Sequence, residues 1–415
     1  MVERAGYEQL MVPLIERAAS FSEEIVGDSP WPEWDQRGCF YLSVRDYGAD
    51  YDQVVGETPA VLIPEGTISV SRWLGGLLDQ PEPVVLPLKV WYELPCPRNE
   101  LLDTLSETKR REFTQFGLEV LGAANPAADT EVLCLVQDLL TAVGVDPAGL
   151  RARLSDVRVF NQMVEESEVP QADRIALKEA MDGIAECRAG KRPERLPALL
   201  RAAEEVLDRQ HLQPGAREAW RQVLDHAAGR VTKELRSALG AANHDALDHL
   251  DEMQRELTAT GLGATVDLCV VRSHEYYTGL SFELDIVTPA ATYVEVAGGG
   301  RYDKLVGNFT QAVAGGVVPC TGFAFGVERV AAVLEALDLF GDPTTTSTRH
   351  DFSDSSADVL ALPLRDPSAV AGYLATRDKV QAQRQNFRVD IYVGDDADEE
   401  SVAGYARARG ISQRD

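Results

Sequence analysis

Long apolar runs are missing from this 415-residue chain, and none approaches the ~20 consecutive apolar residues that a membrane-spanning helix needs. The first residues, MVERAGYEQL, carry charge and lack a basic region followed by an apolar stretch, so we expect no secretory signal. The six cysteines are widely spaced and form no C-x-x-C pair, which indicates reduced, buried thiols rather than disulfides or zinc ligands. Together these absences predict a cytoplasmic protein that does not enter a membrane.

Positive charge is also scarce, because 40 Lys and Arg stand against 67 Asp and Glu, for a formal net charge of −27. Proteins bind nucleic acids through clustered Lys and Arg, so this chain must concentrate its few basic residues locally or bind no polyanion. We expect no DNA binding. Apolar residues make up 45 % and charged residues 26 %, which excludes disorder for the chain as a whole.

Composition and periodicity divide the chain into five parts. Residues 1–122 mix short β-type runs with helical pieces, as in an antiparallel sheet with packed helices, and 123–262 carry apolar residues at helical spacing. Strand patterns return in 263–339, so we expect the sheet to resume after an inserted helical domain. Residues 340–356 read as a linker, and 357–415 show a β-α-β-α series that ends directly after a helix. The predicted class is α+β, with a small, reduced or truncated C-terminal α/β domain.

Polar groups interrupt several otherwise apolar strand contexts. These segments are 64–67 (PEGT), 91–100 (WYELPCPRNE), 109–122 (KRREFTQFGLEVLG), 272–279 (RSHEYYTG), 298–303 (GGGRYD) and 322–329 (GFAFGVER). Each has an ordinary explanation when taken alone. Thr67 could cap the following helix, Gln115 and Glu119 could lie on a solvated strand face, and the three glycines could form a tight turn.

A ligand-binding interpretation treats the same residues differently. Gln115 and Glu119 share one face of a strand, where burial costs free energy unless polar ligands meet them. Small residues alternating from Gly322 to Gly326 leave a flat strand surface on which a planar ring could lie. Arg329, at the start of the next helix, adds a charge suited to phosphate.

In this order the segments resemble the motifs of class II aminoacyl-tRNA synthetases, specifically histidyl-tRNA synthetase and its paralogues. RSHEYYTG is similar to the family's histidine motif, GGGRYDKL to its glycine loop, and GFAFGVERV to its motif 3. WYELPCPRNE with RREFTQFGLE is similar to motif 2, and PEGT to the amino-acid clamp. The resemblance implies a class II synthetase-type antiparallel sheet, an anticodon-binding-like C-terminal domain, a homodimer, ATP and Mg²⁺ as cofactors, and histidine or an analogue as substrate.

The resemblance also implies residue roles. Arg98 and Arg272 would be catalytic, because two anions must meet when a carboxylate attacks the α-phosphate, and rigid guanidinium groups would neutralise them. The implied ATP-binding residues are Arg98, Glu100, Lys109, Arg111 and Arg329. The implied amino-acid-binding residues are Glu65, Thr67, Gln115, Glu119, Tyr276, Tyr277, Gly299 and Arg301. No protein ligands for a metal are expected.

The sequence departs from the family's motifs at the surfaces where the family would contact tRNA. The motif 2 loop, residues 99–108, contains acidic residues and no basic ones, and the C-terminal stretch 394–406 reads GDDADEESVAGYA. Acidic side chains at both surfaces would repel phosphates, unless the tRNA contacts have moved, for example to the arginines of 191–209. Three functions stay open: a histidyl-tRNA synthetase, a paralogue that passes the acyl group to a non-tRNA acceptor, and a histidine-sensing regulatory subunit of ATP phosphoribosyltransferase. The arginines retained at 98, 272 and 329 favour an enzyme.

Overall fold

The computed structural model describes residues 1–27, 36–49, 53–100, 110–226, 228–272, 275–339, 359–363, 388–395, 398–409, 411 and 413–414. Three sequence predictions lie outside these residues: the ATP-binding role of Lys109, most of the acidic loop 99–108, and the linker 340–356. Among the described residues, no helix is both long enough and apolar enough to span a bilayer.

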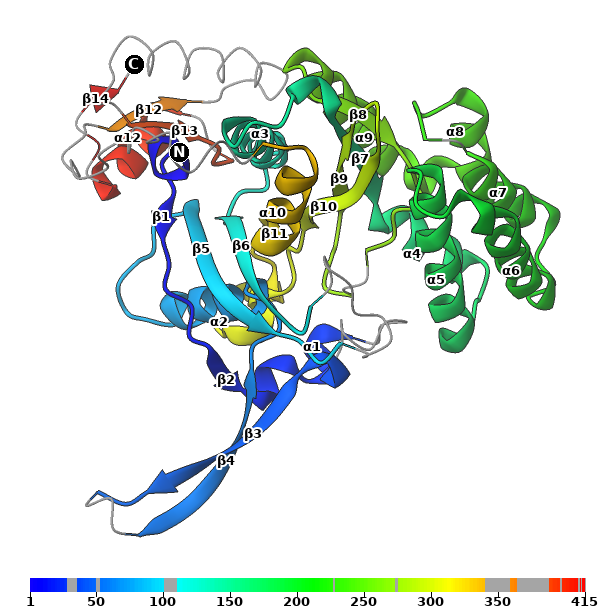
Figure 1. Ribbon diagram of the computed structural model, residues 1–415. Coiled ribbons are helices and arrows are strands. Elements are labelled where there is room, and N and C mark those ends of the chain that lie inside the picture. The colour runs from blue at the N-terminus through cyan, green and yellow to red at the C-terminus, as the bar shows by residue number, and fades with distance from the viewer. Residues whose placement is uncertain are drawn as a thin grey trace.

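An eight-stranded sheet forms the centre of the molecule (Figure 1). In spatial order its strands are β1 (Glu8–Gln9), β5 (Leu88–Pro97), β6 (Glu112–Leu121), β11 (Cys320–Gly326), β10 (Thr292–Arg301), β9 (Leu280–Val287), β7 (Leu150–Asp156) and β8 (Gly263–Val266). Neighbours pair antiparallel except β1 with β5 and β7 with β8, at the two edges. The predicted mixed fold with a largely antiparallel sheet is confirmed.

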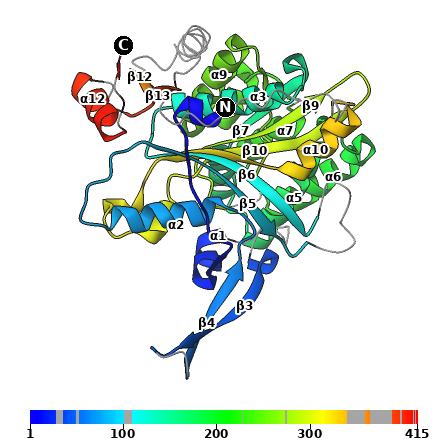
Figure 2. The ribbon, with the colours of Figure 1, turned by 60° about the vertical axis from the view of Figure 1, so that its left-hand side comes forward.

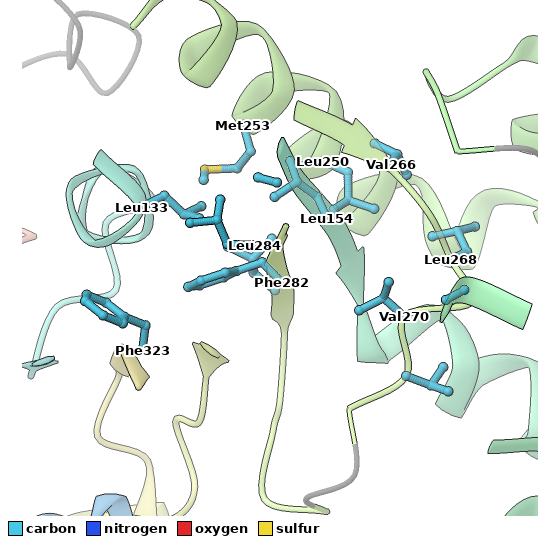
Figure 3. Close-up of a cluster of buried hydrophobic side chains, with 14 of the residues drawn as sticks. Leu133, Leu154, Leu250, Met253, Val266, Leu268, Val270, Phe282, Leu284 and Phe323 are labelled. Carbon is cyan, nitrogen blue, oxygen red and sulfur yellow. The ribbon is translucent and has the colours of Figure 1, made fainter. Parts of the chain in front are cut away.

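Two helices pack against the central sheet, α9 (His244–Ala259) on β7 and β8, and α3 (Ala127–Ala142) on β6, β10 and β11. All but the last residue of β9 are buried, which fits a strand covered on both faces. Figure 3 shows the apolar side chains that fill this space, among them Leu133 of α3, Leu154 of β7, Met253 of α9 and Phe282 of β9. Their burial ties α3 and α9 to the sheet.

This packing corrects the predicted boundary between sheet and insertion. β7 lies inside residues 123–262, yet it pairs with β9 and β8 as part of the central sheet. The helical block is therefore narrower, and Figure 1 shows it to one side of the sheet. It contains α4 (Val157–Glu166), α5 (Gln171–Arg188), α6 (Leu196–Arg209), α7 (Pro214–Asp225) and α8 (Lys233–Leu239). β7 escapes sequence detection because Arg151 and Arg153 interrupt its apolar residues, and the acidic partners of Arg153 are far away in sequence.

A second antiparallel sheet has the order β2 (Ile15–Arg17), β4 (Val54–Leu62), β3 (Phe40–Tyr47). Figures 1 and 2 show β3 and β4 extending as a ribbon away from the rest of the molecule. The ribbon carries several exposed apolar side chains, among them Tyr41, Val44, Val54 and Val55. The chain then enters α2 (Thr67–Leu78), whereas the short α1 (Glu23–Val26) precedes β3.

The C-terminal part forms a parallel three-stranded sheet, with β12 (Val359–Pro363) between β13 (Arg388–Tyr392) and β14 (Gln413–Arg414), and the helix α12 (Glu399–Ala408). β14 supplies the strand that the sequence pattern lacked after α12. The buried Lys89 of β5 joins this part to the central sheet, because its Nζ lies 3.0 Å from Glu131 Oε1 and 2.7 Å from Asp390 Oδ1.

Candidate active site

A cavity of about 260 Å³ lies over the middle strands of the central sheet. Strands β6, β9, β10 and β11 supply one part of its lining, and the helix α10 (Val327–Ala336) and α5 of the helical block supply others. Most of the sequence-predicted site residues meet here: Glu65, Thr67, Arg98, Glu100, Gln115, Glu119, Arg272, Tyr276, Tyr277 and Arg329. Residues more than 260 positions apart in the chain thus share one cavity.

Glu119 lines the cavity and is only 1 % exposed. Its Oε2 accepts a hydrogen bond from the Tyr302 hydroxyl at 2.6 Å, and its Oε1 accepts one from the Thr67 hydroxyl at 2.9 Å. Burial raises the pKa of Glu119 to about 8, so this carboxyl carries a proton over much of the neutral range. A buried carboxyl that can donate or accept suits a neutral heterocycle with ring nitrogens of both kinds.

Glu65 lies beside Glu119 and organises the start of α2. Its two carboxylate oxygens accept hydrogen bonds from the backbone N–H groups of Thr67 at 2.8 Å and Ile68 at 2.9 Å. Desolvation by burial raises the pKa of Glu65. The alternative in which Thr67 caps this helix is wrong, because Glu65 accepts the N–H bonds and the Thr67 hydroxyl donates into the cavity.

Three guanidinium groups also line the cavity. Arg98 is 5 % exposed, donates to the carbonyl of Pro64 at 2.9 Å and stacks 4.8 Å from the ring centroid of Phe113. Arg329 donates to the carbonyl of Glu295 at 2.7 Å. Arg272 completes the set, and together these cations suit a polyphosphate ligand.

One residue predicted to contact ATP lies beside the cavity lining. Arg111 does not itself line the cavity, and its Nε and Nη2 donate to the carbonyl of Glu100, a lining residue, at 3.0 and 2.9 Å. Its neighbour Arg110 lines the cavity. The ATP-binding role of Arg111 stays a prediction.

Two predicted amino-acid contacts also lie outside the cavity lining. Arg301 is 7 % exposed and pairs with Asp129 of α3, with an Nη2–Oδ2 distance of 2.9 Å. Gly299 faces the neighbouring strand, where an added Cβ would come within 2.1 Å of the Gly322 carbonyl oxygen. These residues hold the sheet together around the site, and the adjacent Gly298 and Tyr302 line the cavity in their place.

The helical block contributes a group of acids that no motif marks. Asp182 and Glu186 lie one turn apart on α5, and their carboxylate oxygens and that of Glu295 of β10 are all within 4.8 Å of one another. Carboxylate oxygens are the ligands that Mg²⁺ prefers, so this group could hold a divalent cation at the cavity wall. In so acidic a chain, two acids one turn apart give no sequence signal of their own.

Comparison with known proteins agrees with this arrangement. The family model described as histidyl-tRNA synthetase matches residues 52–330, which is more than half of the chain. The chain belongs to the histidyl-tRNA synthetase family. The match includes every predicted site residue, although the roles of those residues in this member are a separate question.

Two kinds of relative share this family. The histidine–tRNA ligase of Synechocystis sp. is 28 % identical over 341 residues, covering 81 % of this chain and 64 % of that protein, so the matched region is less than two thirds of its length. The ATP phosphoribosyltransferase regulatory subunit of Moorella thermoacetica is 30 % identical over 330 residues, covering 78 % and 73 %. Family membership alone therefore does not distinguish a ligase from a regulator.

Solved structures support the fold. A histidyl-tRNA synthetase from Nostoc sp. matches with a TM-score of 0.59 at 15 % identity, covering 99 % of this chain and 83 % of that one. A protein from Bacillus halodurans, described as an ATP phosphoribosyltransferase regulatory subunit/histidyl-tRNA synthetase, matches with a TM-score of 0.56 at 18 % identity, covering 100 % and 90 %.

Proposed function

We propose that this protein activates histidine, or a close analogue, with ATP to form an aminoacyl-adenylate and pyrophosphate. A carboxylate oxygen of the amino acid attacks the α-phosphorus, and the bond from that phosphorus to the pyrophosphate oxygen breaks with its electron pair. The observation that carries the proposal is one cavity lined both by buried carboxyls and by Arg98, Arg272 and Arg329. Fixed guanidinium groups stabilise the charge that builds up when two anions react.

Each cavity residue has a proposed role. Arg98 and Arg272 would contact the α-phosphate, whereas Glu100, Arg110 and Arg329 would contact the rest of ATP. The residues proposed for the amino acid are Glu65, Thr67, Gln115, Glu119, Tyr276, Tyr277 and Tyr302. Arg110 is added to the predicted set because it lines the cavity, and Tyr302 is added because its hydroxyl contacts Glu119.

Magnesium is the expected companion of ATP, and Asp182, Glu186 and Glu295 fit it as a set of oxygen ligands. When bound, Mg²⁺ would neutralise charge on the phosphates of the leaving group. Lys191, whose Nζ lies 3.8 Å from Glu295 Oε2, balances part of the acidic charge.

Histidine-dependent exchange of labelled pyrophosphate into ATP tests this proposal. We expect exchange with histidine and none without an amino acid. Exchange that does not depend on any amino acid, or no exchange at all in the presence of Mg²⁺, would contradict an adenylate-forming activity.

The relative from Moorella thermoacetica supports a second candidate, a regulatory subunit that binds histidine without activating it. Titration calorimetry with histidine separates the two candidates when it is combined with the exchange assay. Binding without exchange supports the regulator, whereas binding with exchange supports the ligase.

Transfer of the acyl group to tRNA is the usual continuation in this family, and a non-tRNA acceptor is the alternative. In the C-terminal part, Asp395 accepts from the backbone N–H groups of Ala124 and Asn125, and Asp398 caps α12 through the N–H groups of Glu400 and Ser401. These two acids thus have structural partners, which weakens the argument that they exist to exclude tRNA. Charging of bulk tRNA with labelled histidine decides between the acceptors.

We further propose a homodimer in which the β3–β4 ribbon takes part. Val55 is 65 % exposed and Tyr41 is 54 % exposed on this ribbon, and exposed apolar groups of this kind are typical of protein interfaces. We expect Val55→Asp to shift the sedimentation coefficient toward that of a monomer. The matched control is Val143→Asp, at an exposed valine that directly follows α3 and lies outside the ribbon, which should leave the sedimentation of the wild type unchanged.

A further inference from the structure

We propose that Arg153 is a positioning residue for Arg272 and acts through the carboxylate of Glu283. The inference rests on the proposed function, in which Arg272 meets the reacting groups. Arg153 lies on β7, outside the cavity lining, and no recognised motif contains it.

Arg153 is held firmly at one side. It is 4 % exposed, and it forms a two-point interaction with Asp285, with Nε–Oδ2 and Nη2–Oδ1 distances of 2.7 and 3.1 Å. Asp285 Oδ1 also accepts the backbone N–H of Glu295 at 2.9 Å, which ties this pair to β10. A guanidinium fixed by two parallel hydrogen bonds has little rotational freedom.

Arg153 then fixes Glu283, its direct cross-strand partner on β9. Arg153 Nη2 lies 2.7 Å from Glu283 Oε2, and the other oxygen, Oε1, lies 3.2 Å from Arg272 Nη1. Each oxygen of one buried carboxylate therefore holds one guanidinium. Rotation of Glu283 away from Arg153 would also take its second oxygen away from Arg272.

Two neighbours orient Arg272 in the cavity, the carboxylate of Glu283 and the ring of Tyr277, whose centroid lies 5.9 Å from the guanidinium carbon. The Nε of Arg272 has no hydrogen-bond partner among the described residues, although that atom is buried. An added Cβ at Gly298 would lie 2.6 Å from Arg272 Nη1, so the absence of a side chain there makes room for the guanidinium. Glu283 is the carboxylate of the two neighbours, so its position helps to set the direction of the guanidinium.

The test is the steady-state kinetics of histidine-dependent pyrophosphate exchange in Arg153→Gln. We expect kcat at pH 7 to fall roughly 10- to 100-fold, with a much smaller change in the KM for histidine, because a misplaced catalytic group costs about that much. Arg153→Lys should restore part of kcat, because it returns the positive charge without the two-point geometry of the guanidinium.

Arg409→Gln is the matched control. Arg409 is also a mostly buried arginine that pairs with a carboxylate, with 2.6 Å between its Nη1 and Glu8 Oε1, and it lies outside the cavity lining. Both variants should lose stability, but only Arg153→Gln should lower kcat with little change in the KM for histidine. If Arg153→Gln loses stability and keeps the kcat of the wild type, the ion pair is merely structural and the inference is overturned.

Failure of the proposed function would give a different result, since the wild type would then lack exchange. In that case the inference is tested by calorimetry with a non-hydrolysable histidyl-sulfamoyl adenosine, which presents the adenylate's groups without reaction. A lower affinity for this analogue in Arg153→Gln, absent in Arg409→Gln, supports the positioning role. The same affinity in both variants overturns it.

Discussion

The cavity is lined by two fully buried carboxyls, Glu119 and Glu283, in opposite surroundings. Hydroxyl groups surround Glu119, from Tyr302, Thr67 and Tyr92. Guanidinium groups hold Glu283. Burial raises the pKa of both groups, to about 8 and about 7.

The two surroundings explain how one cavity could recognise a neutral ring and an anion side by side. Hydroxyl partners accept or donate with either protonation state of Glu119, so these surroundings adapt to a neutral ligand. Glu283 instead has two cations as neighbours, and its own charge fixes their direction before any phosphate arrives. The predictions below disturb the surroundings of one carboxyl and leave those of the other intact.

The largest effect is expected from Arg272→Ala beside Glu283. We expect pyrophosphate exchange to fall on the order of 10²- to 10³-fold, because a preorganised donor in the transition state is lost. Histidine binding, measured by calorimetry, should stay largely intact, since the hydroxyl partners of Glu119 are untouched. Exchange at the wild-type rate would contradict the assignment of Arg272.

A smaller effect, in the binding of histidine, is expected from Glu119→Gln among the hydroxyl groups. The amide keeps the shape but offers one acceptor and a fixed donor, so the Tyr302 and Thr67 hydroxyls lose part of their pairing. We expect the KM for histidine to rise roughly tenfold, from the loss of about 1.4 kcal/mol in hydrogen bonding, with a lesser change in kcat. A change confined to kcat would place Glu119 at the reacting centre instead.

The central sheet and most of the cavity residues could be predicted from the sequence for a physical reason. Strands and turns of the sheet have local patterns, and short polar interruptions such as PEGT and RSHEYYTG stand out against apolar strands. β7 was missed because Arg153 looks like a solvated residue until Glu283 and Asp285, about 130 positions later, are brought beside it.

The direction in which side chains point is the other feature that could not be predicted from the sequence. Arg110 and Arg111 are equivalent in sequence, and only the path of the chain into β6 decides which one faces the cavity. Asp182 and Glu186 look like ordinary surface acids of an amphipathic helix. Their place at the cavity wall depends on how α5 packs against the sheet, and no local pattern encodes that.

The smallest effect is expected from Tyr302→Phe, which removes one hydroxyl from Glu119 and leaves the guanidinium groups around Glu283 unchanged. We expect a loss of about 1 kcal/mol in the free energy of unfolding, measured by urea denaturation at pH 6, where Glu119 is protonated. The Tyr302 hydrogen bond favours the ionised carboxylate and lowers the pKa of Glu119 against the effect of burial. As pH rises through about 8, the wild-type carboxylate ionises with this donor in place, whereas the variant must ionise without it. The difference between the two proteins should therefore be larger at pH 9 than at pH 6, and a constant difference would mean that Glu119 does not titrate in this range.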